Sequence, residues 1–136
     1  MGVFARIFHK QGELPAPLRA ELDAEDLLYL AEAAGGSLRY ADFRAPGKRF
    51  KGKRSGRVWG IAVTRSRLVV VTGGQVELNA EWHSPLGDGV DVQQLDGKLV
   101  IGFEGALRDP LSSGRVEIHA AVPDGERAIS IISALR

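Results

Sequence analysis

Apolar and polar residues alternate along much of the chain after residue 36, in short segments separated by turn residues. Strict alternation is the pattern of a β-strand with one face buried and one face in water. The clearest example is the segment 76–83, in which Val, Leu, Ala and Trp alternate with Glu, Asn, Glu and His. The pattern predicts seven short strands, in residues 38–43, 57–64, 67–72, 76–83, 90–95, 99–103 and 115–120.

The connections expected between these strands are rich in small and polar residues. Arg65-Ser66 is expected to join the second and third strands, while Gly73-Gly74 and Asp96-Gly97 are typical of tight hairpin turns. Residues 45–56, APGKRFKGKRSG, combine a proline with glycines, lysines and arginines, which predicts an exposed loop. Strands joined by such short turns are expected to be antiparallel.

A period close to four predicts a helix on each side of the strands. Asp23 is placed to cap the first helix, and Gly35-Gly36 to end it. Apolar residues with helical spacing then predict helices at 23–36 and 124–136. The residues expected on the buried faces are Leu27, Leu30, Ala31 and Ala34 in the first helix, and Ala128, Ile129, Ile131, Ile132 and Leu135 in the second.

Together these elements predict one mainly β domain with two helices. We expect a seven-stranded antiparallel orthogonal sandwich or partly open barrel, capped at one end by the C-terminal helix. The expected boundaries are an N-terminal extension at 1–22, a helix at 23–36, the strands within 37–122 and the capping helix at 124–136.

Composition narrows the class of protein. The 136 residues are 44% hydrophobic and 26% charged, which is ordinary for a soluble domain. The absence of cysteine excludes disulfides and thiolate zinc sites. No apolar stretch reaches the roughly 18 to 20 residues that a membrane-spanning helix needs, and the N-terminus lacks a secretory apolar region. We therefore expect a cytoplasmic protein, with a peripheral membrane position as an extension of that expectation.

Basic residues gather in one window that contains no acidic residue, between Asp42 and Glu77. The candidate anion-binding residues in this window are Lys48, Arg49, Lys51, Lys53, Arg54 and Arg57. Clustered basic side chains attract anionic lipid at about 1 kcal/mol per residue near the surface. A solvated loop that only keeps the chain soluble is the other interpretation of the same residues.

The strand and helix order, together with one segment, resembles the bacterial pleckstrin-homology-like (PH-like) domains. The segment is Gly60–Val71, GIAVTRSRLVVV, which is similar to their hairpin of apolar strand, Thr-x-x-Arg and apolar strand. The resemblance covers roughly residues 24–136 and implies a barrel capped by its last helix. It also implies that a ligand lies between the first two strands, where residues 48–57 fall. The second strand begins Arg57-Val58-Trp59, without the Lys/Arg-x-Arg of eukaryotic phosphoinositide-binding domains, so a site specific for phosphoinositides is not expected.

Other chemistry-bearing residues do not form a motif. Those considered are His9, His83, His119, Ser84, Ser112, Ser113, Asp88, Asp91 and Asp96. The histidines are dispersed and two of them are expected on outward strand faces, the serines lack a strand–turn–helix elbow, and the aspartates lack EF-hand spacing. We expect no catalytic residue, no metal site and no cofactor. Trp59 and Trp82 are expected in the core.

Two functions from different classes follow. The first is a non-enzymatic binding module that meets anionic lipid or another polyanion through the basic loop. The alternative is a protein-interaction or assembly module that forms homo-oligomers or docks a partner, through an exposed strand edge or through the apolar Val3, Phe4, Ile7 and Phe8. Nucleic acid is a less favoured partner, because no interleaved aromatic residues offer stacking surfaces.

Overall fold

The computed structural model describes residues 11–136, in which seven antiparallel strands form one open sheet in the order β4-β3-β2-β1-β7-β6-β5. The strands are β1 (Leu27–Ala45), β2 (Lys48–Thr64), β3 (Arg67–Thr72), β4 (Gln75–Glu81), β5 (Asp91–Leu95), β6 (Lys98–Glu104) and β7 (Ser113–Ala120). The helices of these residues are α2 (Ala16–Ala24), α3 (Pro85–Gly89), α4 (Gly105–Arg108) and α5 (Gly125–Leu135). The expected apolar contacts of residues 1–8, and His9, lie outside the described residues.

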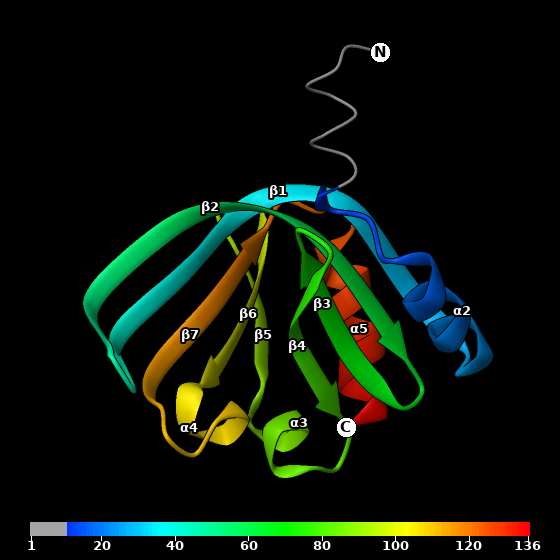
Figure 1. Ribbon diagram of the computed structural model, residues 1–136. Coiled ribbons are helices and arrows are strands. Elements are labelled where there is room, and N and C mark those ends of the chain that lie inside the picture. The colour runs from blue at the N-terminus through cyan, green and yellow to red at the C-terminus, as the bar shows by residue number, and fades with distance from the viewer. Residues whose placement is uncertain (1–10) are drawn as a thin grey trace.

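The long central strands give the sheet its shape. β1 and β2 arch across the molecule, with β3 and β4 on one side of the arch and β7, β6 and β5 on the other (Figure 1). The main core lies on the inner face of this arch, around Trp59, Ile61 and Phe103. On that face α5 packs Ala128 and Ile132 into the core, and Tyr29 Oη donates a 2.9 Å hydrogen bond to Asp124 just before the helix. The expected C-terminal helix is therefore confirmed.

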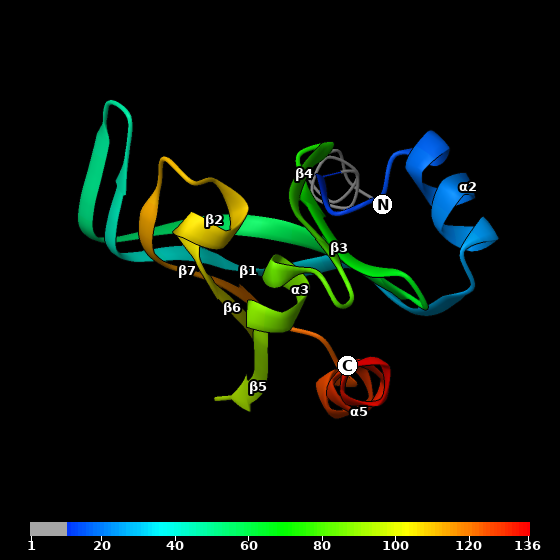
Figure 2. The same ribbon diagram turned by 90° about the horizontal axis from the view of Figure 1, so that it is seen from below.

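A second, smaller core lies on the outer face of β2 and β3. Leu22 of α2 is fully buried there together with Ala62 and Val69. Figure 2 shows α2 and α5 on opposite sides of β1. The middle of the sheet is therefore covered on both faces, and its residues are apolar in runs without alternation.

That double coverage explains why the helix expected at 23–36 is wrong. Residues 27–36 form the first half of β1, and the helix that precedes the sheet is α2, which ends at Ala24 and has Pro17 in its first turn. Tyr29 faces the main core, whereas Leu27 and Leu30 pack against the smaller one. Irregularities in the β1–β2 pairing at two places, one with Ala33 at a φ of 57°, disrupt the alternation further and produce an apparent helical spacing.

The two predicted hairpin turns are confirmed. Gly73-Gly74 joins β3 to β4 and Asp96-Gly97 joins β5 to β6, and all four residues have positive φ between 52° and 76°. Two successive positive φ values are the signature of the type I′ hairpin turn, which glycine and aspartate tolerate best. Trp59 and Trp82 are 0% and 7% exposed, so their expected core positions are confirmed.

Two expected face assignments are wrong. Val76 is 51% exposed, because an irregularity between Val70 and Val71 in the β3–β4 pairing shifts the alternation of β4 at its start. His119 is only 4% exposed: β7 is an internal strand, and the His119 Nε2 atom lies 3.0 Å from Glu117 Oε1. Within residues 11–136, no helix has the length and apolar character required to cross a membrane.

Candidate anion-binding hairpin

The outer part of the β1–β2 hairpin carries the candidate residues, and we call residues 37–57 the basic hairpin. The expectation of a loop at 45–56 is wrong, because β1 and β2 pair without a register shift from Ala34↔Trp59 to Ala45↔Lys48. Only Pro46 and Gly47 lie outside the strands, with Gly47 at a φ of 74°. The outer part of the hairpin covers little of the core, so it needs few apolar residues. Its lysine, arginine and glycine residues therefore lack the apolar alternation from which a strand is predicted.

β2 has a neighbour on both sides only over part of its length. It pairs with β3 over Gly60–Val63, so residues 48–57 form an edge strand whose outer backbone groups have no partner among the described strands. Gly56 O accepts a 2.9 Å hydrogen bond from Arg57 Nη1, and Val58 O, just after this segment, accepts one of 2.9 Å from Thr72 Oγ1. The rest of this edge is lined by basic side chains.

Positive charge is concentrated on this hairpin and is not neutralised by the described residues. Its basic residues are Arg39, Arg44, Lys48, Arg49, Lys51, Lys53, Arg54 and Arg57, and its one acidic residue is Asp42. None of the eight has a described carboxylate oxygen within 4.0 Å. Six arginines elsewhere do form such ion pairs: Arg19, Arg65, Arg67, Arg108, Arg115 and Arg127. The hairpin is therefore the positively charged end of a chain whose formal net charge is only +1.

Strand pairing places like charges opposite each other. Arg39 is the cross-strand partner of Arg54, and Arg44 is the partner of Arg49. Like charges directly opposite on neighbouring strands destabilise the pair. A bound anion between two guanidinium groups would remove this repulsion and accept charge-assisted hydrogen bonds from both.

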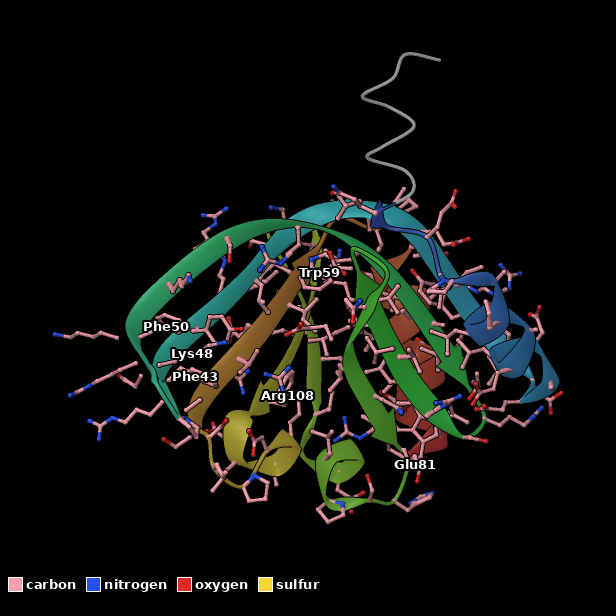
Figure 3. All side chains as sticks on the ribbon, in the orientation of Figure 1. Phe43, Lys48, Phe50, Trp59, Glu81 and Arg108 are labelled. Atoms are coloured by element: carbon pink, nitrogen blue, oxygen red, sulfur yellow. The ribbon has the colours of Figure 1, made fainter. Side chains whose placement is uncertain are left out.

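An aromatic cluster holds the hairpin against the body of the protein. The Tyr40 ring centroid lies 4.7 Å from that of Phe43 and 5.3 Å from that of Phe50, and Phe43 and Phe50 stack at 6.1 Å. Lys53 Nζ lies 4.3 Å from the centroid of the Phe50 ring. Figure 3 shows Phe43 and Phe50 beside Lys48 at the outer end of β1 and β2. The charges are therefore carried by a packed hairpin instead of a free loop.

The basic hairpin and β7 line a hollow in the surface of the sheet. The cross-strand pair Ala41 and Gly52 gives it small residues in the middle, and Arg39, Arg54 and Arg115 are among the side chains around it. Arg115 differs from the others, because Asp91 accepts two 2.8 Å hydrogen bonds from it and Glu117 a third of 3.0 Å. The Asp91 carboxylate is the main cause of the raised pKa of Arg115. Arg39, Lys53 and Arg54 are the cations of this hollow that have no described carboxylate partner.

All six residues expected to bind an anion lie on β2. Lys48, Arg49, Lys51, Lys53 and Arg54 are exposed, whereas Arg57 is half-buried. The interpretation from sequence missed Arg39, which lies outside the acid-free window, and the aromatic cluster that positions the hairpin. The register between β1 and β2 places Arg39 opposite Arg54. This pairing could not be predicted from the sequence, because residues 45–56 were expected to form a loop.

Ser84 and Ser112 have structural roles in turns. Ser84 caps α3 by accepting a 3.0 Å hydrogen bond from Gly87 N, and Ser112 Oγ donates to Asp109 at 3.3 Å. In the described part of the chain, no three His, Cys, Asp or Glu residues gather closely enough to hold a metal ion. His83 is exposed, as expected, in the turn before α3.

Comparisons with known proteins do not name a relative. No protein-family model, curated protein or solved structure matches the chain. The functional assignment therefore depends on the geometry and charge of the basic hairpin.

Proposed function

We propose that this chain is a PH-like, non-enzymatic binding module that contacts an anionic membrane surface through the basic hairpin. The fold supports this proposal through seven antiparallel strands in series, followed by a helix that packs on the inner face of the sheet. The basic residues also lie on the first two strands, where the PH-like resemblance implies a ligand. Such a module would occupy a peripheral position on the membrane.

The observation that carries the proposal is the unneutralised charge of the eight basic side chains. A flat membrane meets one side of a hairpin, so we count about half of them, and about 1 kcal/mol for each gives about 4 kcal/mol. That corresponds to a dissociation constant on the order of 1 mM in lipid. Charge alone therefore predicts weak, reversible association that salt suppresses.

The alternative of self-assembly through the open edge of β2 is opposed by the same charges. Two copies joined along this edge would bring two rows of lysine and arginine side chains together. Like-charge contacts of this kind are one way in which proteins keep edge strands apart. An anionic surface relieves this repulsion, whereas a second copy adds to it.

Vesicle sedimentation tests the proposal. We expect the protein to sediment with phosphatidylcholine vesicles that contain phosphatidylserine, at low salt only, and to remain in solution with pure phosphatidylcholine. The side chains of Lys48 and Lys51 point to opposite sides of β2. The double change Lys48→Glu and Lys51→Glu should therefore weaken binding by about 30-fold, since either side loses one attractive charge and gains one repulsive charge, each of about 1 kcal/mol. Glutamate keeps the edge charged, so the variant should stay soluble.

A matched control has the same change in net charge at other places. Arg65→Glu with Arg136→Glu changes two exposed arginines outside the basic hairpin. This control should bind anionic vesicles almost as well as the original protein. Equal loss in both variants would show that only net charge matters, and equal binding to neutral vesicles would refute the proposal.

A further inference from the structure

The connection between α4 and β7 exposes apolar side chains. Leu111 is 73% exposed and Leu107 is 40% exposed, and Leu111 is the most exposed large hydrophobic residue among residues 11–136. Ala106 and Pro110 in the same segment are also exposed. A single exposed leucine needs no explanation, but an apolar group beside a charged surface often marks an interaction site.

This apolar segment lies next to the outer end of the basic hairpin. Ser113, two residues after Leu111, is the β7 partner of Arg44 on β1. At the other end of the segment, a Cβ atom built on Gly105 would lie 3.1 Å from the ring of Phe43. Figures 1 and 2 agree in placing the α4–β7 connection beside the hairpin turn. The apolar segment and the basic hairpin therefore occupy one end of the molecule.

Local hydrogen bonds hold Leu111 in its exposed position. Asp109 Oδ1 accepts a 3.0 Å hydrogen bond from Leu111 N, and Asp109 O accepts one of 2.9 Å from Ser112 N. Before this turn, Arg108 is fixed by 3.0 Å hydrogen bonds to Glu77 and lies over the Phe103 ring. The acidic side chain of Asp109 is thus engaged within the turn that presents Leu111.

We propose that Leu111 enters the interfacial region of the bilayer whose anionic headgroups the basic hairpin contacts. This inference rests on the proposed membrane function and adds its apolar component. Charge brings the protein to the surface and weakens with salt, whereas burial of a leucine side chain depends little on salt. The two parts are complementary, because the hairpin charges alone predict only weak association.

Fluorescence from a single labelled cysteine tests the proposal directly, since the chain contains no cysteine. Leu111→Cys would be labelled with an environment-sensitive dye and mixed with phosphatidylcholine–phosphatidylserine vesicles. We expect a blue shift and brighter emission, as the dye leaves water. The control is Leu95→Cys, which changes a leucine that is 48% exposed. Leu95 lies at the end of β5, the strand at the edge of the sheet beyond β6. Its label should not respond.

Affinity gives the second measurement. Leu111→Ala should weaken binding to anionic vesicles by about tenfold, from the loss of most of a buried leucine side chain. The loss of affinity caused by Leu111→Ala should be similar at two salt concentrations. In the Lys48→Glu, Lys51→Glu variant, by contrast, the affinity should depend less on salt than in the original protein. An exposed leucine is not needed for folding, so circular dichroism of Leu111→Ala should match the original protein.

The outcomes separate this inference from the proposed function. Binding to anionic vesicles with no response from the Leu111→Cys label would overturn the apolar anchor and leave the proposed function standing. A label response of equal size with neutral vesicles would support the anchor and refute the role of the basic hairpin. Absence of binding to either vesicle would refute both.

Discussion

Arginine residues in the described part of the chain fall into two groups, according to whether they form an ion pair with a carboxylate. Arg67 belongs to the first group, with 2.7 Å to Glu25 and 2.8 Å to Glu21. Arg39 and Arg54 belong to the second, and they face each other. Composition does not distinguish the groups, because the partners of Arg67 come from more than 40 positions away. Charge that is left over after such pairing is the better indicator of a binding surface.

The effect of replacing a glycine also depends on contacts with residues that are distant in the sequence. Gly35 and Gly36 are neighbours in β1, but only Gly36 lies against another backbone, that of His119 in β7. We expect Gly36→Ala to destabilise the protein by about 3 kcal/mol or more, since a Cβ atom would lie 1.7 Å from His119 O.

Gly35→Ala is the matched control, because a Cβ atom there meets nothing within 4 Å. Its unfolding free energy should differ from that of the original protein by less than about 1 kcal/mol. Urea denaturation followed by tryptophan fluorescence measures both variants. Similar stabilities for the two variants would contradict the close β1–β7 contact.

At the scale of elements, most strands were predictable, and the exceptions are the start of β1 and the outer part of β2. β4 alternates over Leu78–Glu81 and β7 over Val116–Ile118, where Leu78, Ala80, Val116 and Ile118 are buried as expected. β1 was predicted as a helix since both of its faces are covered near its start. The outer part of β2 was predicted as a loop since neither face there covers much of the core. Alternation identified β4 and β7, whereas the inner part of β2, β3 and β6 were identified as short apolar runs between turn residues.

The contact between α2 and the sheet depends on pH. Glu25, just after α2, accepts hydrogen bonds of 3.0 and 2.7 Å from Arg67 on β3, and this contact lowers the pKa of Glu25 below 4.5. The folded state then binds a proton less readily than the unfolded state. The stabilisation is therefore present above about pH 4.5 and is lost as the pH falls through the lower, folded-state value.

We expect Glu25→Gln to reduce the unfolding free energy at pH 7 by about 1 to 3 kcal/mol, the usual contribution of a hydrogen bond to a charged group. In strong acid Glu25 of the original protein is protonated and uncharged, like glutamine. The difference in unfolding free energy between the original protein and Glu25→Gln should therefore become smaller as the pH is lowered. Denaturant titrations at neutral and acidic pH measure this. A difference that stays constant with pH would show that the carboxylate charge is unimportant.

At the scale of the whole molecule, charge is distributed unevenly in a nearly neutral chain. The formal net charge of +1 hides a hairpin with eight basic residues and a body in which most arginines are paired. The sequence revealed the basic cluster but not its rigidity or its neighbour Leu111, because both depend on β1, β2 and β7 lying side by side. These long-range contacts decide what the cluster can bind.

The open edge of β2 gives the same charges a second consequence, which concerns aggregation. An unpaired strand edge is a template for further strands, and lysine and arginine side chains are a common protection against such growth. We expect a variant with glutamine at Lys48, Arg49, Lys51, Lys53 and Arg54 to form soluble aggregates, whereas the same five positions changed to glutamate should remain monomeric. Light scattering of the two variants would measure this, and equal behaviour would contradict it. Neutralising the hairpin would therefore favour association between copies of the chain.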